Sequence, residues 1–396
     1  MPSLIRHAGL LRDKTSPERA RVSPVELFFD LVFVFAVTQL SHTLLNDLTL
    51  RGLIETTFLF LAMWWVWIYT TWVTNWLDPE RALVRLLLFV LMLAGLVLSI
   101  SIPTAFTSGA LAFAAAYVFM QVGRSAFTIF ALGTASPNNT RNFQRILAWF
   151  VLSGVFWVAG APAEGSIRFL FWAIALGLEY LSPAVGFWVP RLGRSVTTDW
   201  NVEGEHLAER CGLFVIIALG ESLLITGATF GKLPVTGETV IAFVIAFVGS
   251  VAMWWVYFAI GAERGTEHIA KADDPGRLAR IGYTYLHLLI IAGIIVGAVA
   301  DELVLAHPAG HVDGKTALAI LGGPALFVLG AALFKRLSSS RFPLSHLMGL
   351  GMLAVLAVVH ALLSPLALAA LATATLVMVA TWEWVSLHGG RSAHPG

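Results

Sequence analysis

Two carboxylates open a long apolar segment of this chain. The stretch "VELFFDLVFVFAVTQLSH" (Val25–His42) carries Glu26 and Asp30 four residues apart. On a helix both side chains project from one face, about 6 Å apart along the axis. Ser23 and Pro24 are typical of a helix N-terminus, where the adjacent carboxylate suits the helix dipole. Asp30 lies one turn deeper among phenylalanines, and two neighbouring like charges suit proton or cation handling.

A second polar segment, "EGEHLAERCGLFVIIALGES" (Glu203–Ser222), has the same character. Arg210 and Glu221 are eleven residues apart, so on a helix they point the same way, about 16 Å apart along the axis. Glu221 follows Gly220 well inside the apolar part, where it is either a transport group or a structural partner for another helix. The start of this segment also gathers four ionisable residues: Glu205, His206, Glu209 and Arg210.

Three further ionisable residues, Arg124, Glu179 and His287, lie within apolar segments. Arg124, in "MQVGRSAF", is near the end of its segment, where its side chain could extend to the cytoplasmic surface. The alternative is a counter-ion for Asp30, Glu179 or Glu221. His287 is isolated on an apolar helix, and such a histidine is more often hydrogen-bonded in a core than a proton relay. No His or carboxylate spacing predicts a metal site, and no phosphate or dinucleotide motif is present, so we expect neither metal nor cofactor.

The elements that carry these residues are predicted to be membrane-spanning helices. Hydrophobic residues make up 58% of the 396 residues and charged residues 12%, against about 25% in soluble domains. Mean hydropathy is +0.80. Leu86–Gly123 and Thr239–Ala262 contain no charged residue, and a helix needs about 20 apolar residues to cross a bilayer. The composition therefore predicts an all-α polytopic membrane protein, and the single Cys211 excludes an intramolecular disulfide.

The hydropathy pattern gives about twelve transmembrane helices. With the N-terminus inside, most of the 25 Lys and Arg residues fall on the cytoplasmic side. This excess follows the positive-inside rule and places both termini in the cytoplasm. Residues 1–24 form a basic cytoplasmic tail without the apolar core of a signal peptide, and residues 389–396 form a C-terminal tail. The predicted spans are 25–45, 53–75, 83–103, 107–131, 143–161, 167–189, 206–230, 237–260, 279–300, 316–334, 343–363 and 364–387.

Short motifs recur in the two halves of the chain. "MWWVWIYT" (Met63–Thr70) returns as "MWWVYFAI" (Met253–Ile260), and "DPERALVR" is followed later by "DPGRLAR". The matches keep their order, and their offset grows slowly, as loop insertions would make it grow. We therefore predict two parallel six-helix repeats, 25–195 and 196–388, related by an axis along the membrane normal.

The repeat alignment pairs Glu26 with Glu209 and Glu179 with Glu383. The aromatic motif that recurs in both halves could line a cavity. Trp and Tyr also populate membrane–water interfaces, and this interpretation is the one we favour.

The segments Glu26–His42 and Glu209–Ser222 resemble the bacterial low temperature requirement A (LtrA) family, and the likeness extends over nearly the whole chain. The resemblance implies a multi-pass protein of the bacterial inner membrane, associated with growth in the cold, and implies little chemistry. A looser likeness is to endosomal and lysosomal potassium channels with two six-helix repeats, in which an arginine shortly precedes Phe-Ser-Asp. Here Arg21 is further from "FFD", Phe29 replaces the serine, and "GLFVIIALGES" has no Phe-Asp, so potassium selectivity is not implied.

From these residues we expect a transporter or channel for a small ion or solute. Its pathway would run between the first and seventh helices, with Asp30 and Glu221 as central groups. The alternative is a membrane-embedded enzyme acting on a lipid or isoprenoid through the polar cluster at the start of the seventh helix. Expected partners are membrane lipids and the transported species, with a homodimer left open and no nucleic acid. The remaining candidate pathway residues are Glu26, Arg124, Glu179, Glu209, Arg210 and His287.

Overall fold

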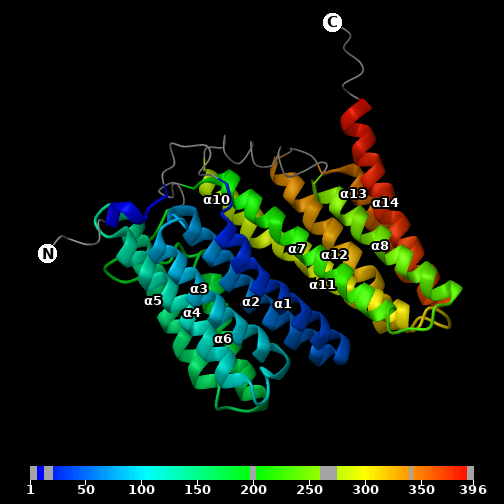
Figure 1. The fold of residues 1–396 in the computed structure, drawn as a ribbon, viewed down its shortest axis with the longest axis horizontal. Coiled ribbons are helices and arrows are strands. Elements are labelled where there is room, and N and C mark those ends of the chain that lie inside the picture. Colours follow the sequence, from blue (N-terminus) through cyan, green and yellow to red (C-terminus); the bar gives the residue numbers. More distant parts are fainter. Residues whose placement is uncertain (1–6, 13–20, 197–201, 259–273, 339–341, 390–396) are drawn as a thin grey trace, which may run out of the picture. The chain divides into compact units, whose positions relative to one another are not determined.

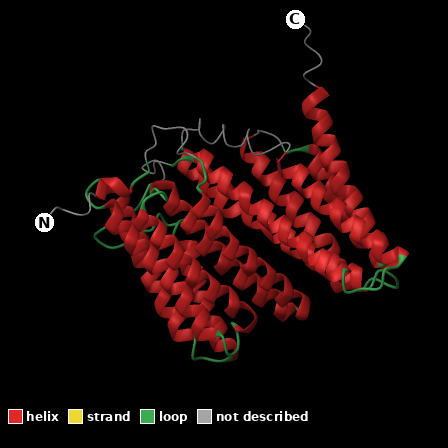
Figure 2. Cartoon of the chain, viewed as in Figure 1, coloured by secondary structure: helices red, strands yellow, loops and turns green. Residues whose placement is uncertain are grey.

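The structure, a computed structural model, is helical throughout its described part (Figure 2). Eleven helices in that part are long and apolar enough to cross a membrane. The prediction of an all-α polytopic membrane protein is therefore confirmed. The described residues are 7–12, 21–196, 202–258, 274–338 and 342–389.

The helices follow one another along the chain, with the longest described connection between α6 and α7 (Figure 1). The first half has α1 (Pro24–Asn46), α2 (Leu50–Trp76), α3 (Ala82–Ser101), α4 (Ala110–Leu132), α5 (Pro137–Gly160) and α6 (Gly165–Leu181), with 3-10 turns at His7–Leu10 and Ile102–Thr104. The second half has α7 (Gly204–Phe230), α8 (Gly237–Phe258), α10 (Pro275–Ala279), a π-helical turn (Arg280–Leu286), α11 (His287–Ala306), α12 (Gly314–Ser338), α13 (Leu344–Val359), a 3-10 turn (His360–Leu362) and α14 (Pro365–Gly389).

One predicted span is shorter than expected. The sequence predicted a helix over 167–189, but α6 ends at Leu181 after 17 residues. Pro183 has no backbone N–H with which to continue the helical hydrogen bonds, and the chain then turns through Gly186 at φ 65°. At 1.5 Å per residue α6 is about 26 Å long, close to the thickness of the hydrocarbon core.

Two compact units make up the chain. In the first, α3 packs on α4, α4 on α5, and α5 on α6, so that successive helices form antiparallel pairs; α2 also packs on α4. In the second, α11 and α12 form the largest contact, and α14 packs on α8, α12 and α13. The two repeats over 25–195 and 196–388 stay a prediction. The first unit comprises Met1–Thr43, Leu50–Arg210 and Asp273–Arg277, and the second Leu44–Thr49, Cys211–Ala272 and Leu278–Gly396.

The aromatic motif has different surroundings in its two copies. Trp64, Trp65 and Trp67 of α2 are completely buried inside the first unit, so the interface interpretation is wrong for this copy. In α8, Trp254 and Trp255 are 44% and 39% exposed. The same sequence motif therefore builds a core in α2 and an outer surface in α8.

Helices α11 and α12 touch through their backbones. A Cβ atom added to Gly293 would lie 2.6 Å from the Phe327 nitrogen, and one added to Gly323 would lie 2.7 Å from the Gly297 nitrogen. Gly293 and Gly297 are four residues apart on one face of α11, the small-residue spacing that lets membrane helices approach closely. Pro324 lies inside α12, and the Gly-Gly-Pro sequence does not interrupt this helix.

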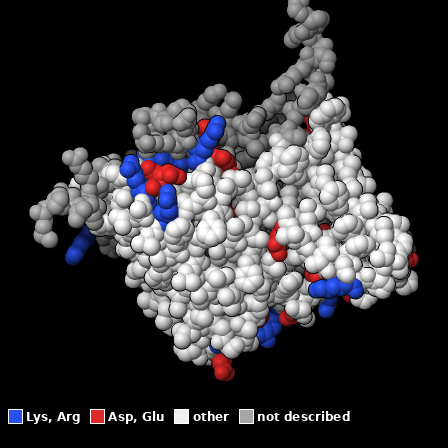
Figure 3. All heavy atoms as spheres, viewed as in Figure 1, with Lys and Arg blue, Asp and Glu red and all other residues white. Residues whose placement is uncertain are grey.

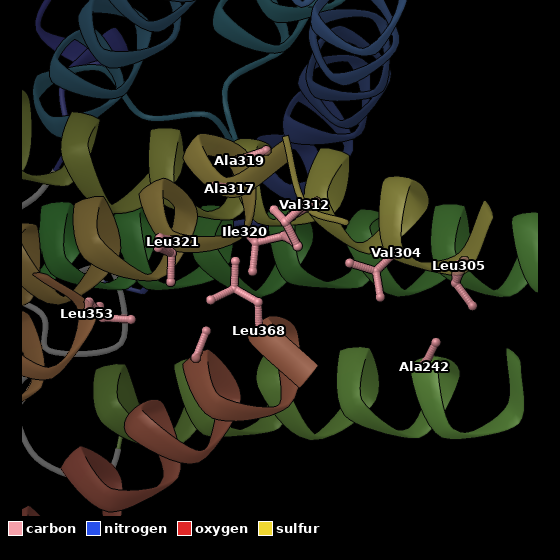
Figure 4. Close-up of a cluster of buried hydrophobic side chains, with 12 residues drawn as sticks. Ala242, Val304, Leu305, Val312, Ala317, Ala319, Ile320, Leu321, Leu353 and Leu368 are labelled. Atoms are coloured by element: carbon pink, nitrogen blue, oxygen red, sulfur yellow. The ribbon is translucent and has the colours of Figure 1, made fainter. Parts of the chain in front are cut away.

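Apolar side chains form the interior of the second unit. Other apolar side chains are exposed on the surfaces of both units. A buried cluster joins α8, α11, α12, α13 and α14 through residues such as Ala242, Val304, Ile320 and Leu368 (Figure 4). Most of the described surface visible in Figure 3 carries no charge. Large apolar side chains such as Leu93 are exposed, as expected for helices surrounded by lipid.

The start of α12 offers a test of a helix cap outside the membrane. Asp313 Oδ1 accepts a hydrogen bond from the Thr316 nitrogen at 2.8 Å. Hydrogen bonds from the Thr316 side chain and from its nitrogen stabilise the charged form and lower the pKa of Asp313 below its usual value. Asp313→Ala is expected to lower the free energy of unfolding by about 0.5–2 kcal/mol at pH 7.

The difference in free energy of unfolding between Asp313→Ala and wild type should become smaller at acidic pH. A carboxylate whose pKa is lowered in the folded state adds stability only above that pKa. Thermal unfolding of both proteins in detergent, at neutral and acidic pH, measures the difference. An equal deficit at both pH values would contradict the charged cap.

Candidate functional site

Glu26 begins α1 and also faces α7. The Ser23 nitrogen and Oγ both donate to Glu26 Oε2 at 2.9 Å, which is the side-chain-to-backbone half of a capping box. The other carboxylate oxygen, Oε1, lies 2.9 Å from His206 Nε2 at the start of α7. The N-terminus interpretation therefore holds for Glu26, and the same carboxylate reaches a second helix.

Two arginines neutralise the carboxylates of α1. Arg12 Nη2 lies 3.3 Å from Glu26 Oε2, and Arg210 Nη1 lies 3.6 Å from Glu26 Oε1. Arg210 Nη2 also makes a 2.8 Å ion pair with Asp30 Oδ1. All of these residues are buried in the first unit, with at most 8% of Arg12 exposed. We call Arg12, Glu26, Asp30, His206 and Arg210 the charge network.

Asp30 is only partly satisfied within this network. Its Oδ1 accepts from Arg210 and also from Trp67 Nε1 of α2, each at 2.8 Å. Among the described residues, Oδ2 has no hydrogen-bond partner, and the same is true of Arg210 Nε. Because Asp30 is completely buried, leaving this oxygen without a partner carries a free-energy cost.

The contact with Asn75 favours a neutral imidazole at His206, whose Nε2 also lies 3.3 Å from Arg12 Nη2. Asn75 donates from Nδ2 to the Glu203 carbonyl at 2.8 Å and accepts from the Glu203 nitrogen at 2.9 Å, which sets the orientation of its amide. The Nδ2 group therefore donates to His206 Nδ1, 3.3 Å away. His206 then carries its hydrogen on Nε2 and donates to Glu26. The charge network thus holds two carboxylates and two guanidiniums, with no net charge.

The pathway predicted from the sequence left out two members of the network. Arg12 was assigned to a basic tail, but the chain before α1 packs on the end of α2: the Arg12 nitrogen donates to the Trp76 carbonyl and the Asp78 nitrogen to the Leu10 carbonyl, both at 2.9 Å. No sequence pattern pointed to this contact. His206 was assigned only to the polar cluster of the enzyme alternative, although it lies one turn before Arg210 on the same helix face.

A second buried cluster holds Arg124 and Glu179. Arg124 does not extend to the surface: it is completely buried and donates to the Val66 carbonyl and Thr70 Oγ1 of α2, both at 3.0 Å. It also donates to Gln121 Oε1. Gln121 Nε2 in turn donates to Glu179 Oε2 at 3.2 Å. Three carboxylates, those of Asp30, Glu179 and Glu221, were considered as counter-ions of Arg124. The structure brings Arg124 near Glu179, with Gln121 between them.

Comparison with known proteins agrees with the sequence motifs. The family described as bacterial low temperature requirement A protein (LtrA) matches residues 21–381. The chain belongs to the LtrA family. It is 43% identical over 390 residues to an uncharacterised protein of Rhizobium meliloti (strain 1021), covering 98% of this chain and 95% of that protein. No solved structure matches.

In this LtrA family member, the four polar residues that an enzyme would use are divided between two faces of α7. His206 and Arg210 are buried in the charge network. Glu205 and Glu209 are exposed, and Glu209 accepts a hydrogen bond from the Val22 nitrogen at 2.9 Å. An enzyme site needs these groups to converge, and the geometry does not assemble one here.

The other predicted pathway residues lie in the second unit. Glu221 is 9% exposed and lies three turns beyond Arg210 along α7. His287 Nε2 is 2.8 Å from the Tyr257 hydroxyl, and its Nδ1 is 2.8 Å from the Gly282 carbonyl, so it is a hydrogen-bonded core histidine. In the described part of the chain, no group of three His, Cys, Asp or Glu side chains could hold a metal ion.

Proposed function

We propose that this LtrA family protein moves a small ion or solute across the bacterial cytoplasmic membrane. Its pathway runs between α1 and the start of α7, and Asp30 is the binding group. The observation that supports this most strongly is the state of Asp30: it is completely buried in a membrane-spanning helix, it pairs with Arg210 through one oxygen, and its other oxygen has no partner among the described residues.

The cost of the charge network also supports a functional role. Ionisable side chains buried within membrane-spanning segments are costly, and such residues commonly mark transport routes. A buried ion pair gives little stability that apolar residues of the same volume would not supply. Stability alone is therefore a poor reason to keep Glu26, Asp30 and their arginines inside the first unit.

The neutral network provides a simple coupling device. A cation or proton at Asp30 Oδ2 competes with Arg210 for the same carboxylate, because either one compensates its charge. Occupation of the site then weakens the 2.8 Å ion pair between α1 and α7. A transporter needs this kind of dependence, in which the ligand changes how two helices are held together.

A hollow at the opposite end of α2 supports an opening on the far side. It has a volume of about 580 Å³ and is lined by residues that include Arg51, Glu55, Phe106 and Phe169. With both termini in the cytoplasm, as the Lys and Arg distribution favours, the charge network lies near the cytoplasmic end of α1 and this hollow lies at the outer end of α2.

The proposal is tested by solid-supported-membrane electrophysiology on purified protein in liposomes. Potassium, sodium, proton and chloride gradients are applied in turn to wild type, Asp30→Asn and the control Glu80→Gln. Asparagine keeps an oxygen that can accept from Trp67 and Arg210, so the fold is expected to survive. Glu80 is exposed between α2 and α3, so its substitution leaves the pathway intact.

We expect a wild-type current that Asp30→Asn loses and Glu80→Gln keeps. An equal current in Asp30→Asn would remove Asp30 from the pathway. The absence of a wild-type current in all four gradients would contradict electrogenic ion movement. Electroneutral transport, by uptake of uncharged solutes or by exchange, would then be measured instead.

A further inference from the structure

Glu179 of α6 is enclosed by neutral hydrogen-bond donors. Its Oε2 accepts from the Tyr117 hydroxyl at 2.5 Å and from Gln121 Nε2 at 3.2 Å. Its Oε1 accepts from Ser153 Oγ at 2.7 Å and from Trp157 Nε1 at 3.1 Å. These four residues of α4 and α5 form what we call the Glu179 cage. With 1% of the residue exposed, the carboxylate lies entirely within the first unit.

The cage contains no counter-charge in direct contact with Glu179. Within the described residues no ion pair involves this carboxylate. Glu383, which the predicted repeat pairs with Glu179, differs: it lies 2.8 Å from Lys335 Nζ and 3.2 Å from His346 Nδ1. Glu383 therefore has a cation that holds it in the charged form, whereas Glu179 is surrounded by neutral dipoles that suit either protonation state.

Ser153 allows the cage to hydrogen-bond Glu179 in both its charged and its protonated form. Its Oγ lies 2.7 Å from Glu179 Oε1 and 3.2 Å from the Phe150 carbonyl, so one hydroxyl hydrogen has two acceptors. When Glu179 is charged, Ser153 donates to it. When Glu179 is protonated on Oε1, the acid donates to Ser153 Oγ and the serine hydrogen turns to Phe150. No buried polar group loses its hydrogen bond in either state.

The nearest permanent charge does not depend on the state of Glu179. Arg124 donates to the Val66 carbonyl, Thr70 Oγ1 and Gln121 Oε1, all of them neutral acceptors. Its guanidinium therefore keeps these bonds whether Glu179 is charged or protonated. The charged Arg124 and the titratable Tyr117 of α4 lie near Glu179, together with Tyr180 of α6; Tyr69 of α2 lies beside Arg124, and α5 contributes the uncharged Ser153 and Trp157.

We propose that Glu179 is a proton-binding site, at which one proton is taken up from water and returned to it while Ser153 changes from donor to acceptor. The site is separate from Asp30, so this inference goes beyond the proposed transport role and does not rest on it. The cage joins α4, α5 and α6, and Gln121 links it to Arg124 and α2. Proton uptake thus changes a bond between α5 and α6 without opening the cage.

Infrared difference spectroscopy on the full chain in liposomes tests the site without any transport assay. Spectra at acidic and alkaline pH are compared for wild type, Glu179→Gln and Ser153→Ala, with Glu383→Gln and Asp30→Asn as matched controls. We expect a carboxylic-acid carbonyl band that wild type loses as the pH rises and that Glu179→Gln lacks. Both control variants should keep this band.

Ser153→Ala provides a second arm that keeps the carboxyl group. It removes the acceptor for the acid proton, so the band should move to higher wavenumber and its titration midpoint should shift. A band that Glu179→Gln leaves unchanged would overturn the proposal. So would a Glu179 band that persists, or is missing, at every pH at which the protein remains folded. A silent transport assay has no bearing on this result.

Discussion

Replacing Arg210 with methionine is expected to lower the free energy of unfolding by about 3–5 kcal/mol, because it leaves buried charge without its partner. Arg210 pairs with Asp30 at 2.8 Å and approaches Glu26 at 3.6 Å, and no more than 1% of any of these residues is exposed. Glu26 keeps Arg12 and His206, but Asp30 keeps only the Trp67 N–H among its described partners. Methionine fills much of the volume, so the loss reports the missing charge more than a cavity.

A double variant separates charge from packing. Arg210→Met combined with Asp30→Leu removes both members of the ion pair, and exchanging a buried pair for apolar residues is often neutral or stabilising. Thermal and denaturant unfolding in detergent should therefore show the double variant to be more stable than Arg210→Met alone. Destabilisations that simply add would indicate that the pair has no energetic coupling. The double variant should also lack the current expected of wild type, which would separate folding from transport.

Gly323→Ala is expected to loosen the contact between α11 and α12. Its new Cβ would lie 2.7 Å from the Gly297 nitrogen and 2.9 Å from the Gly297 Cα, both backbone atoms that cannot turn aside as a side chain can. Overpacking of this kind costs about 1–3 kcal/mol. The helices must separate to accept the methyl group, so the apolar cluster that they share with α8, α13 and α14 should loosen with them.

The neighbouring Gly322 is a matched control on the same helix. A Cβ added to Gly322 meets nothing closer than Val296 Cγ1 at 3.9 Å, an ordinary van der Waals contact. Gly322→Ala should therefore be neutral or slightly stabilising, since alanine favours helix over glycine by about 0.5–1 kcal/mol. Unfolding curves of the two variants in detergent measure the contrast. Equal behaviour of the two variants would contradict the backbone contact at Gly323.

Helix α2 connects the charge network with the Arg124 cluster. Trp67 donates to Asp30, and Thr71 Oγ1 lies 3.4 Å from Arg210 Nη2. Val66 directly precedes Trp67, and Thr70 directly precedes Thr71. The Val66 carbonyl and Thr70 Oγ1 both accept hydrogen bonds from Arg124. Adjacent residues on a helix point in different directions, so α2 presents one cluster on each side. A shift of α2 that follows ligand binding at Asp30 would be felt by Arg124 and, through Gln121, by the Glu179 cage.

The fold class could be predicted from sequence because its signals are local. Uncharged runs such as Leu86–Gly123 must lie in lipid or in a core, and their lengths match helices that cross a bilayer. The four-residue spacing of Glu26 and Asp30 placed both on one face of α1, and the structure brings both to Arg210. The family match likewise rests on contiguous motifs.

The partners of these residues depend on packing between distant parts of the chain. Arg12 reaches Glu26 because the chain before α1 pairs with the end of α2. No periodic pattern in the sequence predicts this contact. Ser153 meets Glu179 only when α5 and α6 pack at one particular register. The same aromatic motif is buried in α2 and exposed in α8 because the neighbouring helices differ. Hydrophobicity is a property of each residue and can be read along the chain, whereas a buried charge is satisfied by groups that the three-dimensional fold brings together.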